Sequence, residues 1–181
     1  MYYRNCGDPL TLIIEESSGL CGPGAVITDC HIRTLDTDDG PLDLHFPAED
    51  VVNKVIMNPQ VLFDRVSELD MSSDFVQVEL SPLDPYFSLS TKGNLVKVTD
   101  KVDQDSTQIL SFEVKKYQRL SYRTNIFKLI HKTLQCCSKV SIRTNEDGFI
   151  CLQFMVRFDN CPKICFVEFF FAPAEQIEID L

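Results

Sequence analysis

The sequence predicts an α+β protein in which several antiparallel strands accompany two amphipathic helices. Four short segments (75–81, 86–91, 94–102 and 108–114) alternate apolar and polar residues, and Pro, Gly, Asp and Asn separate them. Segments 59–69 and 122–135 instead have the apolar spacing of helices. Three further strand patterns, at 139–144, 149–158 and 163–172, complete this part of the chain, with a turn at 145–148 between the first two.

The first 57 residues contain three more predicted strands and a connector. The segments 9–16 and 24–35 read as strands on either side of a turn-rich stretch, and Val51–Met57 is rich enough in β-branched residues for another. Residues 36–50 hold two prolines, a glycine and a strong excess of acidic side chains, which is typical of a connector. Pro59 fits the first turn of the helix that follows.

The composition is that of a folded protein with an acidic surface. The chain has 181 residues, and 17 basic against 27 acidic side chains give a formal net charge of −10, which excludes a generally basic nucleic-acid coat protein. The length suggests one domain, or one and a part. No apolar run reaches the roughly 18 residues of a membrane span, and the N-terminus lacks a signal-peptide pattern. We therefore expect an intracellular protein with no membrane partner.

Eight cysteines raise the question of disulfides or metal ligands. Disulfide frameworks are typical of short secreted chains, and several of these cysteines lie within apolar strand patterns. Cys161 and Cys165 have three residues between them, Cys136 and Cys137 are adjacent, and no pair of CxxC knuckles is present. We therefore expect buried free thiols, no metal site and no cofactor.

Basic residues are concentrated in one part of the chain. Residues 1–110 carry 7 basic and 19 acidic side chains, whereas residues 111–181 carry 10 basic and 8 acidic ones. Eight basic residues and one acid lie between Glu113 and Arg143; the basic ones are Lys115, Lys116, Arg119, Arg123, Lys128, Lys132, Lys139 and Arg143. Because screening confines each field to about 10 Å, one local positive patch can attract a phosphate backbone despite the negative total.

The second helix, predicted from Tyr122 to Gln135, has an apolar and a polar face. At ~100° per residue, one arc holds Tyr122, Ile126, Phe127, Leu129, Ile130 and Leu134, and the opposite arc holds Thr124, Asn125, Lys128, His131, Lys132 and Gln135. The polar arc contains no acid. It is either an ordinary solvated face or a face that meets phosphate.

The order of elements resembles a known architecture. From residue 51 it is a strand, a short helix, four strands, a helix and three strands, which resembles one repeat of the sliding-clamp fold, the unit duplicated in proliferating cell nuclear antigen. Two long segments are more specific: VVNKVIMNPQVLFDRVSELDMSSDFVQVELSPLDPYFSLSTKGN and CSKVSIRTNEDGFICLQFMVRFDNCPKICFVEFFFAP resemble the Rad-one subunit family of the nine-one-one checkpoint clamp. The resemblance covers nearly the whole chain.

This resemblance implies a sliding-clamp fold, with two helices on one face of antiparallel sheets. It also implies a non-catalytic subunit of a heterotrimeric ring that encircles DNA at damage sites in the nucleus and supports checkpoint signalling and DNA repair. The implied partners are the other two ring subunits, a clamp loader, repair and checkpoint proteins, and double-stranded DNA without sequence specificity. Since clamp helices line the hole, the implied DNA-facing residues are Arg65, Arg123, Lys128, His131 and Lys132.

Two strands are implied to join neighbouring subunits. The outer strand of the first repeat would run from Ala25 to Leu35 and that of the second from Asn94 to Val102, each pairing through backbone hydrogen bonds. The implied interface positions are Ala25, Ile27, Asp29, His31 and Arg33, and on the second strand Leu95, Lys97, Thr99 and Lys101. The alternative is that both are ordinary edge strands protected by charged residues.

The resemblance also divides the chain into parts. Residues 1–36 would be the closing strands of an incomplete first clamp domain, 37–50 the interdomain connector, 51–173 a complete second domain and 174–181 a tail. In the connector, Asp38, Asp39, Leu42, Leu44 and Phe46 either present a docking surface or belong to a solvated tether. Because the first domain is incomplete, the alternative function is a truncated interaction module that binds a partner subunit or client without encircling DNA.

The sequence does not favour an enzyme. Exonuclease activity has been linked to this family, but a two-metal nuclease needs several convergent carboxylates, and the densest aspartates lie in the predicted connector without fixed geometry. No GxSxG, P-loop, GxGxxG or HExxH pattern is present. No catalytic residue is therefore assigned.

Overall fold

The chain forms two structural units, Met1–Leu44 and His45–Leu181. The computed structural model describes residues 1–5, 7–16, 26–34, 46–84, 86–92, 97–102, 107–158 and 161–174. The first unit contains an antiparallel pair of strands, β1 (Leu10–Glu16) and β2 (Val26–Ile32). Both strands predicted in this region are therefore present. The boundary between the units falls inside the segment expected to be the connector.

The second unit contains a five-stranded antiparallel sheet with the order β11-β10-β9-β3-β7. Its strands are β3 (Asn53–Met57), β7 (Ile109–Val114), β9 (Cys137–Thr144), β10 (Ile150–Phe158) and β11 (Cys161–Phe171). Successive side chains point to opposite faces of each strand. Val55 of β3, Val140 of β9 and Leu152 of β10 are buried on the inner face. The polar residues that alternate with such apolar positions along each strand face outward.

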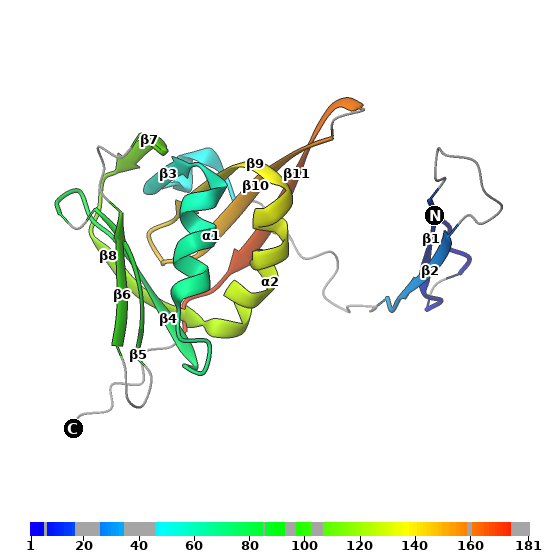
Figure 1. Ribbon diagram of the computed structural model, residues 1–181, viewed down its shortest axis with the longest axis horizontal. Helices are drawn as coiled ribbons and strands as arrows, with labels where there is room; N and C mark the ends of the chain where they lie inside the picture. The colour runs from blue at the N-terminus through cyan, green and yellow to red at the C-terminus, as the bar shows by residue number, and fades with distance from the viewer. Residues whose placement is uncertain are drawn as a thin grey trace. The chain divides into compact units, whose positions relative to one another are not determined.

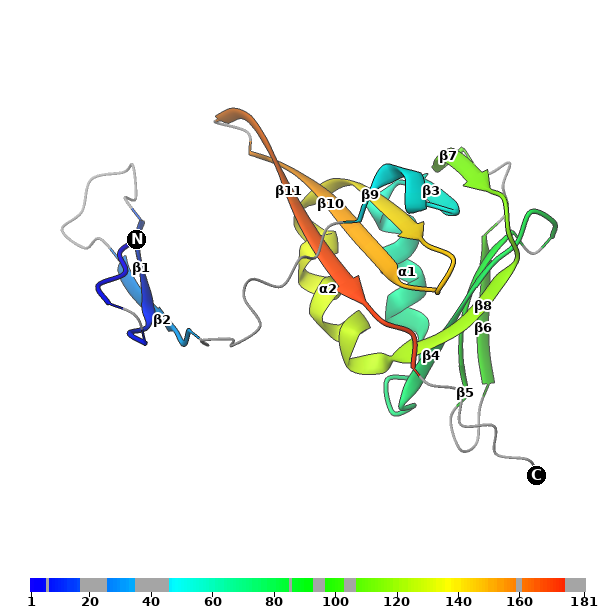
Figure 2. The same ribbon diagram turned by 180° about the vertical axis from the view of Figure 1, so that it is seen from behind.

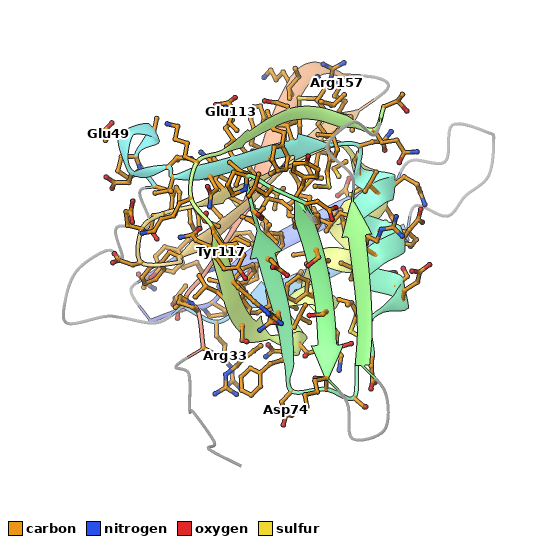
Figure 3. All side chains as sticks on the ribbon, turned by 90° about the vertical axis from the view of Figure 1, so that its left-hand side faces the viewer. Arg33, Glu49, Asp74, Glu113, Tyr117 and Arg157 are labelled. Carbon is orange, nitrogen blue, oxygen red and sulfur yellow. The ribbon has the colours of Figure 1, made fainter. Side chains whose placement is uncertain are left out.

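A second antiparallel sheet has four strands in the order β6-β5-β4-β8. These are β4 (Phe75–Leu80), β5 (Phe87–Lys92), β6 (Lys97–Val102) and β8 (Gln118–Arg123). Figure 3 shows β4, β5 and β6 side by side, with Asp74 just before β4. Val78 and Leu89 pair across β4 and β5 and are buried, so this sheet also contributes an apolar inner face.

Two helices, α1 (Pro59–Glu68) and α2 (Thr124–Cys136), lie side by side against the five-stranded sheet (Figures 1 and 2). Asn58 caps α1 because its side-chain oxygen accepts a hydrogen bond from the backbone N–H of Gln60 at 3.0 Å. A short 3-10 helix (Ala48–Asp50) precedes β3. None of the helices in the described part of the chain is long and apolar enough to cross a membrane.

The core lies where the helices meet the inner faces of both sheets. Leu62 and Val66 of α1 and Phe127, Ile130 and Leu134 of α2 are all buried in one cluster with the inward-facing strand residues. Each helix therefore buries one face and leaves the opposite face exposed. This leaves the solvent face of the helix layer and the outer face of the five-stranded sheet on opposite sides of the second unit.

Strand β8 is absent from the sequence-based prediction, which began the second helix at Tyr122 instead of Thr124. The segment does alternate, since Gln118 and Tyr122 are buried and Arg119 and Arg123 are exposed. A glutamine at a core position concealed this alternation. The tertiary fold accepts the glutamine because both its side-chain oxygen and its side-chain nitrogen make hydrogen bonds, which a sequence pattern does not reveal.

These hydrogen bonds form a buried polar junction, defined by Asn53, Gln118 and Thr144, that joins the two sheets. The Asn53 amide donates to Gln118 Oε1 at 2.8 Å and to the Lys116 carbonyl at 2.9 Å, and its oxygen accepts from the N–H groups of Lys115 and Lys116 at 3.0 Å. Thr144 donates to Gln118 Oε1 at 2.6 Å. One side chain on β3 thus fixes the crossover from β7 in one sheet to β8 in the other.

Replacing Asn53 by alanine should destabilise the second unit substantially. Four hydrogen bonds disappear and several buried groups lose their partners, so we expect the free energy of unfolding to fall by about 2–4 kcal/mol. Urea unfolding followed by circular dichroism measures this. Gln135→Ala, at an exposed position of α2, serves as the control and should change stability by no more than ~0.5 kcal/mol. If both variants lower the free energy of unfolding by a similar small amount, the junction does not stabilise the second unit.

The turn between β9 and β10 depends on a glycine. Gly148 has a φ of 81°, a left-handed conformation that favours glycine, and an added Cβ would overlap Cδ1 of Leu120. Its carbonyl also accepts a hydrogen bond from the Tyr122 hydroxyl at 2.6 Å. The predicted turn at 145–148 is therefore confirmed, and β8 packs directly on it.

Gly148→Ala should reduce the free energy of unfolding by about 1–3 kcal/mol, through backbone strain and overlap with Leu120. The two causes can be separated by introducing the same change into a Leu120→Ala background, where only the strain remains. Urea titrations of the four proteins form a double-mutant cycle. If the cost of Gly148→Ala is equal in both backgrounds, the overlap contributes nothing.

Candidate nucleic-acid interface and subunit edges

The exposed face of α2 carries two lysines and no acid. Lys128 and Lys132 are one helical turn apart and exposed, and neither has an ion-pair partner among the residues that the structure describes. Asn125 and Gln135 are exposed on the same helix. Because no carboxylate of α2 lies beside the lysines, this face can approach phosphate groups without local repulsion from its own helix.

The buried arc of α2 is rotated from the predicted one. Leu129, expected in the core, is 62% exposed, and Thr124, expected on the polar arc, is 3% exposed. The predicted helix includes Tyr122, which belongs to β8. Counting this residue as helical shifts the centre of the expected apolar arc toward Leu129. With the correct helix boundary, Lys132 lies near the middle of the exposed arc.

The other predicted DNA-facing residues of α2 are placed differently. Arg123 is exposed at the N-cap, where its side chain makes no capping hydrogen bond. His131 is half-buried at the junction of the two helices: its ring lies against Phe63, with centroids 4.5 Å apart, and its Nε2 is 3.3 Å from Ser67 Oγ. The structure therefore brings His131 to α1 and leaves the two lysines facing solvent.

The exposed surface of α1 has charges of both signs. Arg65 lies 3.9 Å from Glu68, and Asp64 accepts a hydrogen bond from Gln60 at 2.6 Å. The positive charge of Arg65 is partly balanced by its own helix. Positive charge on the helix layer therefore comes mainly from α2.

The basic run between Glu113 and Arg143 does not form one patch, so that prediction is wrong. Arg119 is on the outer face of β8, whereas Lys128 and Lys132 are on α2. Arg143 is on the face of β9 away from the helices, where it pairs with a glutamate of β11 at 2.8 Å. Strand alternation and the change from β8 to α2 distribute residues that are close in sequence over different surfaces.

The first predicted subunit edge corresponds to β2. Ile27, Asp29 and His31 are exposed on this strand and Arg33 follows it, while Ala25 is outside the described residues. Strand β2 pairs with β1 on one side, and no other described strand pairs with it. The His31 ring nitrogen Nδ1 lies 3.1 Å from Thr11 Oγ1, so this side chain contacts β1.

The second predicted subunit edge corresponds to β6. It contains Lys97, Thr99 and Lys101, while Leu95 is outside the described residues. Strand β6 pairs in register with β5, with Thr99 opposite Ser90, and it is the terminal strand of the four-stranded sheet. Among the described strands, its other edge has no partner, so backbone donors and acceptors are available for pairing.

Only the end of the predicted connector is described. Asp38, Asp39, Leu42 and Leu44 are outside the described residues. Phe46 contacts the outer face of the five-stranded sheet, with its ring centroid 6.3 Å from that of Phe170 and 5.8 Å from the Arg143 guanidinium carbon. The connector therefore reaches the sheet through an aromatic contact and a cation–π contact.

The prediction of buried free thiols is only partly correct. Free thiols occur at Cys30, Cys136, Cys137, Cys151 and Cys165, but Cys30, Cys136 and Cys165 are exposed. An apolar strand pattern does not imply burial when the strand is at an edge, as β2 and β11 are. Burial raises the pKa of the Cys137 thiol to about 11, which keeps it protonated at neutral pH. Within the described ranges, no cluster of three or more His, Cys, Asp or Glu residues could hold a metal ion.

Comparisons with known proteins identify relatives with named roles. Residues 1–156 match the family described as "Repair protein Rad1/Rec1/Rad17". The chain is 38% identical over 177 residues to the mouse "Cell cycle checkpoint protein RAD1" and 29% identical over 175 residues to the Drosophila melanogaster "DNA repair protein Rad1". It is also 28% identical over 152 residues to a protein of Methanopyrus kandleri named "DNA polymerase sliding clamp".

The alignment with the mouse protein covers 98% of this chain and 60% of the relative. The corresponding shares are 96% and 62% for the fly protein, and 82% and 58% for the archaeal one. The chain thus spans about 60% of the length of its mouse relative. The two helices beside antiparallel sheets agree with the clamp fold expected from the sequence. With this architecture and the match over residues 1–156, the chain belongs to the Rad1/Rec1/Rad17 family of repair proteins and has an α+β sliding-clamp fold.

Proposed function

We propose that this chain is a non-catalytic subunit of a heterotrimeric clamp that encircles DNA at damage sites and supports checkpoint signalling and repair in the nucleus. The observation that carries the proposal is the exposed, acid-free face of α2 with Lys128 and Lys132. The names of the relatives, checkpoint protein, repair protein and sliding clamp, support the same role.

The proposed mechanism is positioning rather than bond chemistry. Lysines one turn apart on a helix can contact successive phosphates, and such contacts carry no base-sequence information, so the protein can move along the duplex. A two-metal nuclease needs several convergent carboxylates beside its substrate. Helix α2 has no carboxylate beside these lysines. The chain would therefore hold DNA while a clamp loader and repair or checkpoint proteins act on the assembled ring.

Ring formation would use the two strand edges. The free edge of β2 would pair with one neighbouring subunit and that of β6 with the other, through backbone hydrogen bonds. Because both edges occur in this chain, it would have a different neighbour at each of them. Side chains along the strands would then distinguish the correct partner from the wrong one.

A second candidate is an interaction module that binds one partner subunit or client without encircling DNA. The first unit favours this possibility, because it is a two-stranded pair with Ile13, Ile14 and Ile27 exposed. An experiment with the two partner subunits and the clamp loader separates the candidates. A ring stays on closed circular DNA and leaves when the DNA is cut, whereas a module that binds only protein is not retained in either case.

Lys128→Glu combined with Lys132→Glu should weaken retention of the assembled ring on circular DNA by at least about tenfold at low salt. Two favourable phosphate contacts become repulsive, and the difference should shrink as salt rises and should not depend on DNA sequence. Pull-down of the ring with immobilised plasmid, at several salt concentrations, measures the effect. Thermal unfolding should be nearly unchanged, since both side chains are exposed.

The charge-matched control is Lys139→Glu combined with Lys163→Glu, which alters two exposed lysines on β9 and β11. It changes the net charge by the same amount on strands of the sheet, away from the exposed face of α2. Retention should then remain close to that of the unchanged protein. Equal losses for the two double variants would show that α2 has no special role in DNA binding.

A proline in β6 should disrupt ring assembly at one of two positions. Proline lacks the N–H donor and clashes with a paired strand. The N–H groups of successive residues point to opposite edges of a strand, so the one of Val98→Pro and Thr99→Pro whose N–H points away from β5 should prevent pairing with the neighbour. The other change should damage the pairing with β5. Light scattering of the mixture with both partner subunits measures assembly, and circular dichroism of the isolated chain measures folding.

Lys101→Ala provides a milder comparison in the same strand. It removes a side-chain charge but keeps every backbone donor, so assembly should weaken only slightly, by the ~0.2–1 kcal/mol typical of exposed charges. Normal assembly of both proline variants would refute the assignment of β6 to a subunit interface.

A further inference from the structure

A polar cavity lies on the outer face of the five-stranded sheet, away from the helices and the candidate DNA-binding lysines. It has a volume of about 350 Å³. Its floor is formed by neighbouring strands: Lys54 of β3 is opposite Arg143 of β9, and Ile56 is opposite Ser141. Ala48 and Val51, which precede β3, add apolar surface.

Positive charge predominates in the lining. Lys54, Lys115 and Arg143 contribute three cations, and Glu113 contributes one carboxylate. No ion pair holds Lys54 or Lys115 among the described residues. Glu113 is opposite Lys54 in the strand register and accepts a hydrogen bond from Ser111 at 3.1 Å (Figure 3 labels Glu113 on β7). An anion can therefore bind near the lysines, although two carboxylates are close: Glu113 in the lining, and Glu168, whose charge is paired with Arg143.

Two buried polar atoms of the lining lack partners. The Ser141 side chain is in a residue only 8% exposed, and neither its Oγ nor Arg143 Nε has a hydrogen-bond partner in the described part of the chain. Buried donors without acceptors are unfavourable, so a ligand that supplies an acceptor is favoured. Rotation of the Ser141 hydroxyl and a small shift of the long side chains above it would bring both donors to the cavity.

Part of the Arg143 guanidinium group is already held in place by other contacts. Its Nη2 donates to Glu168 at 2.8 Å and lies 3.2 Å from Cys151 Sγ, and Gln153 donates to the same glutamate oxygen at 2.5 Å. These contacts fix one edge of the guanidinium group and leave Nε unused. Fixed donors lose less freedom on binding than mobile ones.

We propose that this cavity binds the phosphate of a phosphoserine or phosphothreonine in a partner protein. A phosphate monoester carries a charge of about −1.5 to −2 and three acceptor oxygens, which match two free ammonium groups and two unused donors. The volume is more than ten times the ~30 Å³ of one water, which leaves room for a phosphate group and part of a peptide. The apolar lining residues can contact the flanking peptide. The site requires neither ring assembly nor DNA.

The test is a nuclear magnetic resonance titration of the isotope-labelled full chain with a capped five-residue peptide that has phosphoserine between two valines. We expect saturable shifts of the Lys54, Ser141 and Arg143 amides, and a Kd at least about tenfold lower than for orthophosphate or the matching peptides with serine or aspartate. Lys54→Gln with Lys115→Gln should raise the Kd at least about tenfold, whereas Glu113→Gln should lower it about two- to fivefold.

Lys139→Gln is the matched control, because Lys139 is an exposed lysine on β9 that does not line the cavity. It should leave the Kd unchanged. The proposal is overturned by absence of saturable shifts, by equal weakening in the control, or by orthophosphate or the aspartate peptide binding as tightly as the phosphopeptide. The variant with Lys128→Glu and Lys132→Glu should bind the phosphopeptide normally, so failure of the DNA-clamp proposal is distinguishable from failure of this one.

Discussion

The arrangement of the second unit depends on the Asn53 amide. This one side chain satisfies backbone groups at the crossover between the sheets and also binds the side chain of Gln118. Burying a polar group costs free energy unless it is hydrogen-bonded, and here each partner is held by another, since Gln118 also bonds Thr144 and the Asn145 carbonyl. A network of this kind specifies a single geometry more strictly than apolar packing does.

That geometry determines what the helices can do. Strand β8 follows the crossover and leads directly into α2, so the position of the crossover sets where the helix begins and which of its faces is exposed. A start at Thr124 buries Phe127, Ile130 and Leu134 and leaves the lysines outside. The candidate DNA-binding face is therefore connected, through β8, to a hydrogen-bond network in the core.

The sequence predicted most elements because their periodicity is strong, as in β4, β9 and β10. It missed β8 because Gln118 occupies a core position, and it misplaced Leu129 because Tyr122 was counted within the helix. Lys128 and Lys132 were identified correctly as exposed. The cavity beside Ser141 could not be predicted, since its lining comes from β3, β7, β9, β10 and the segments before β3 and after β7. Only the strand register brings these residues together. The charge of the basic run was visible in the sequence, but its division between surfaces was not.

Arg143 contacts both the polar side of the sheet and the aromatic ring at the end of the connector. Its guanidinium group lies over Phe46 and donates to Glu168, so the two contacts share one cation. Contacts that share a group are thermodynamically linked, and linkage is reciprocal. Whatever draws Arg143 toward the sheet weakens its attraction for the Phe46 ring, and whatever displaces Phe46 frees the guanidinium to rearrange. Phe46 and the polar side of the outer sheet surface are therefore coupled through the single guanidinium group that they share.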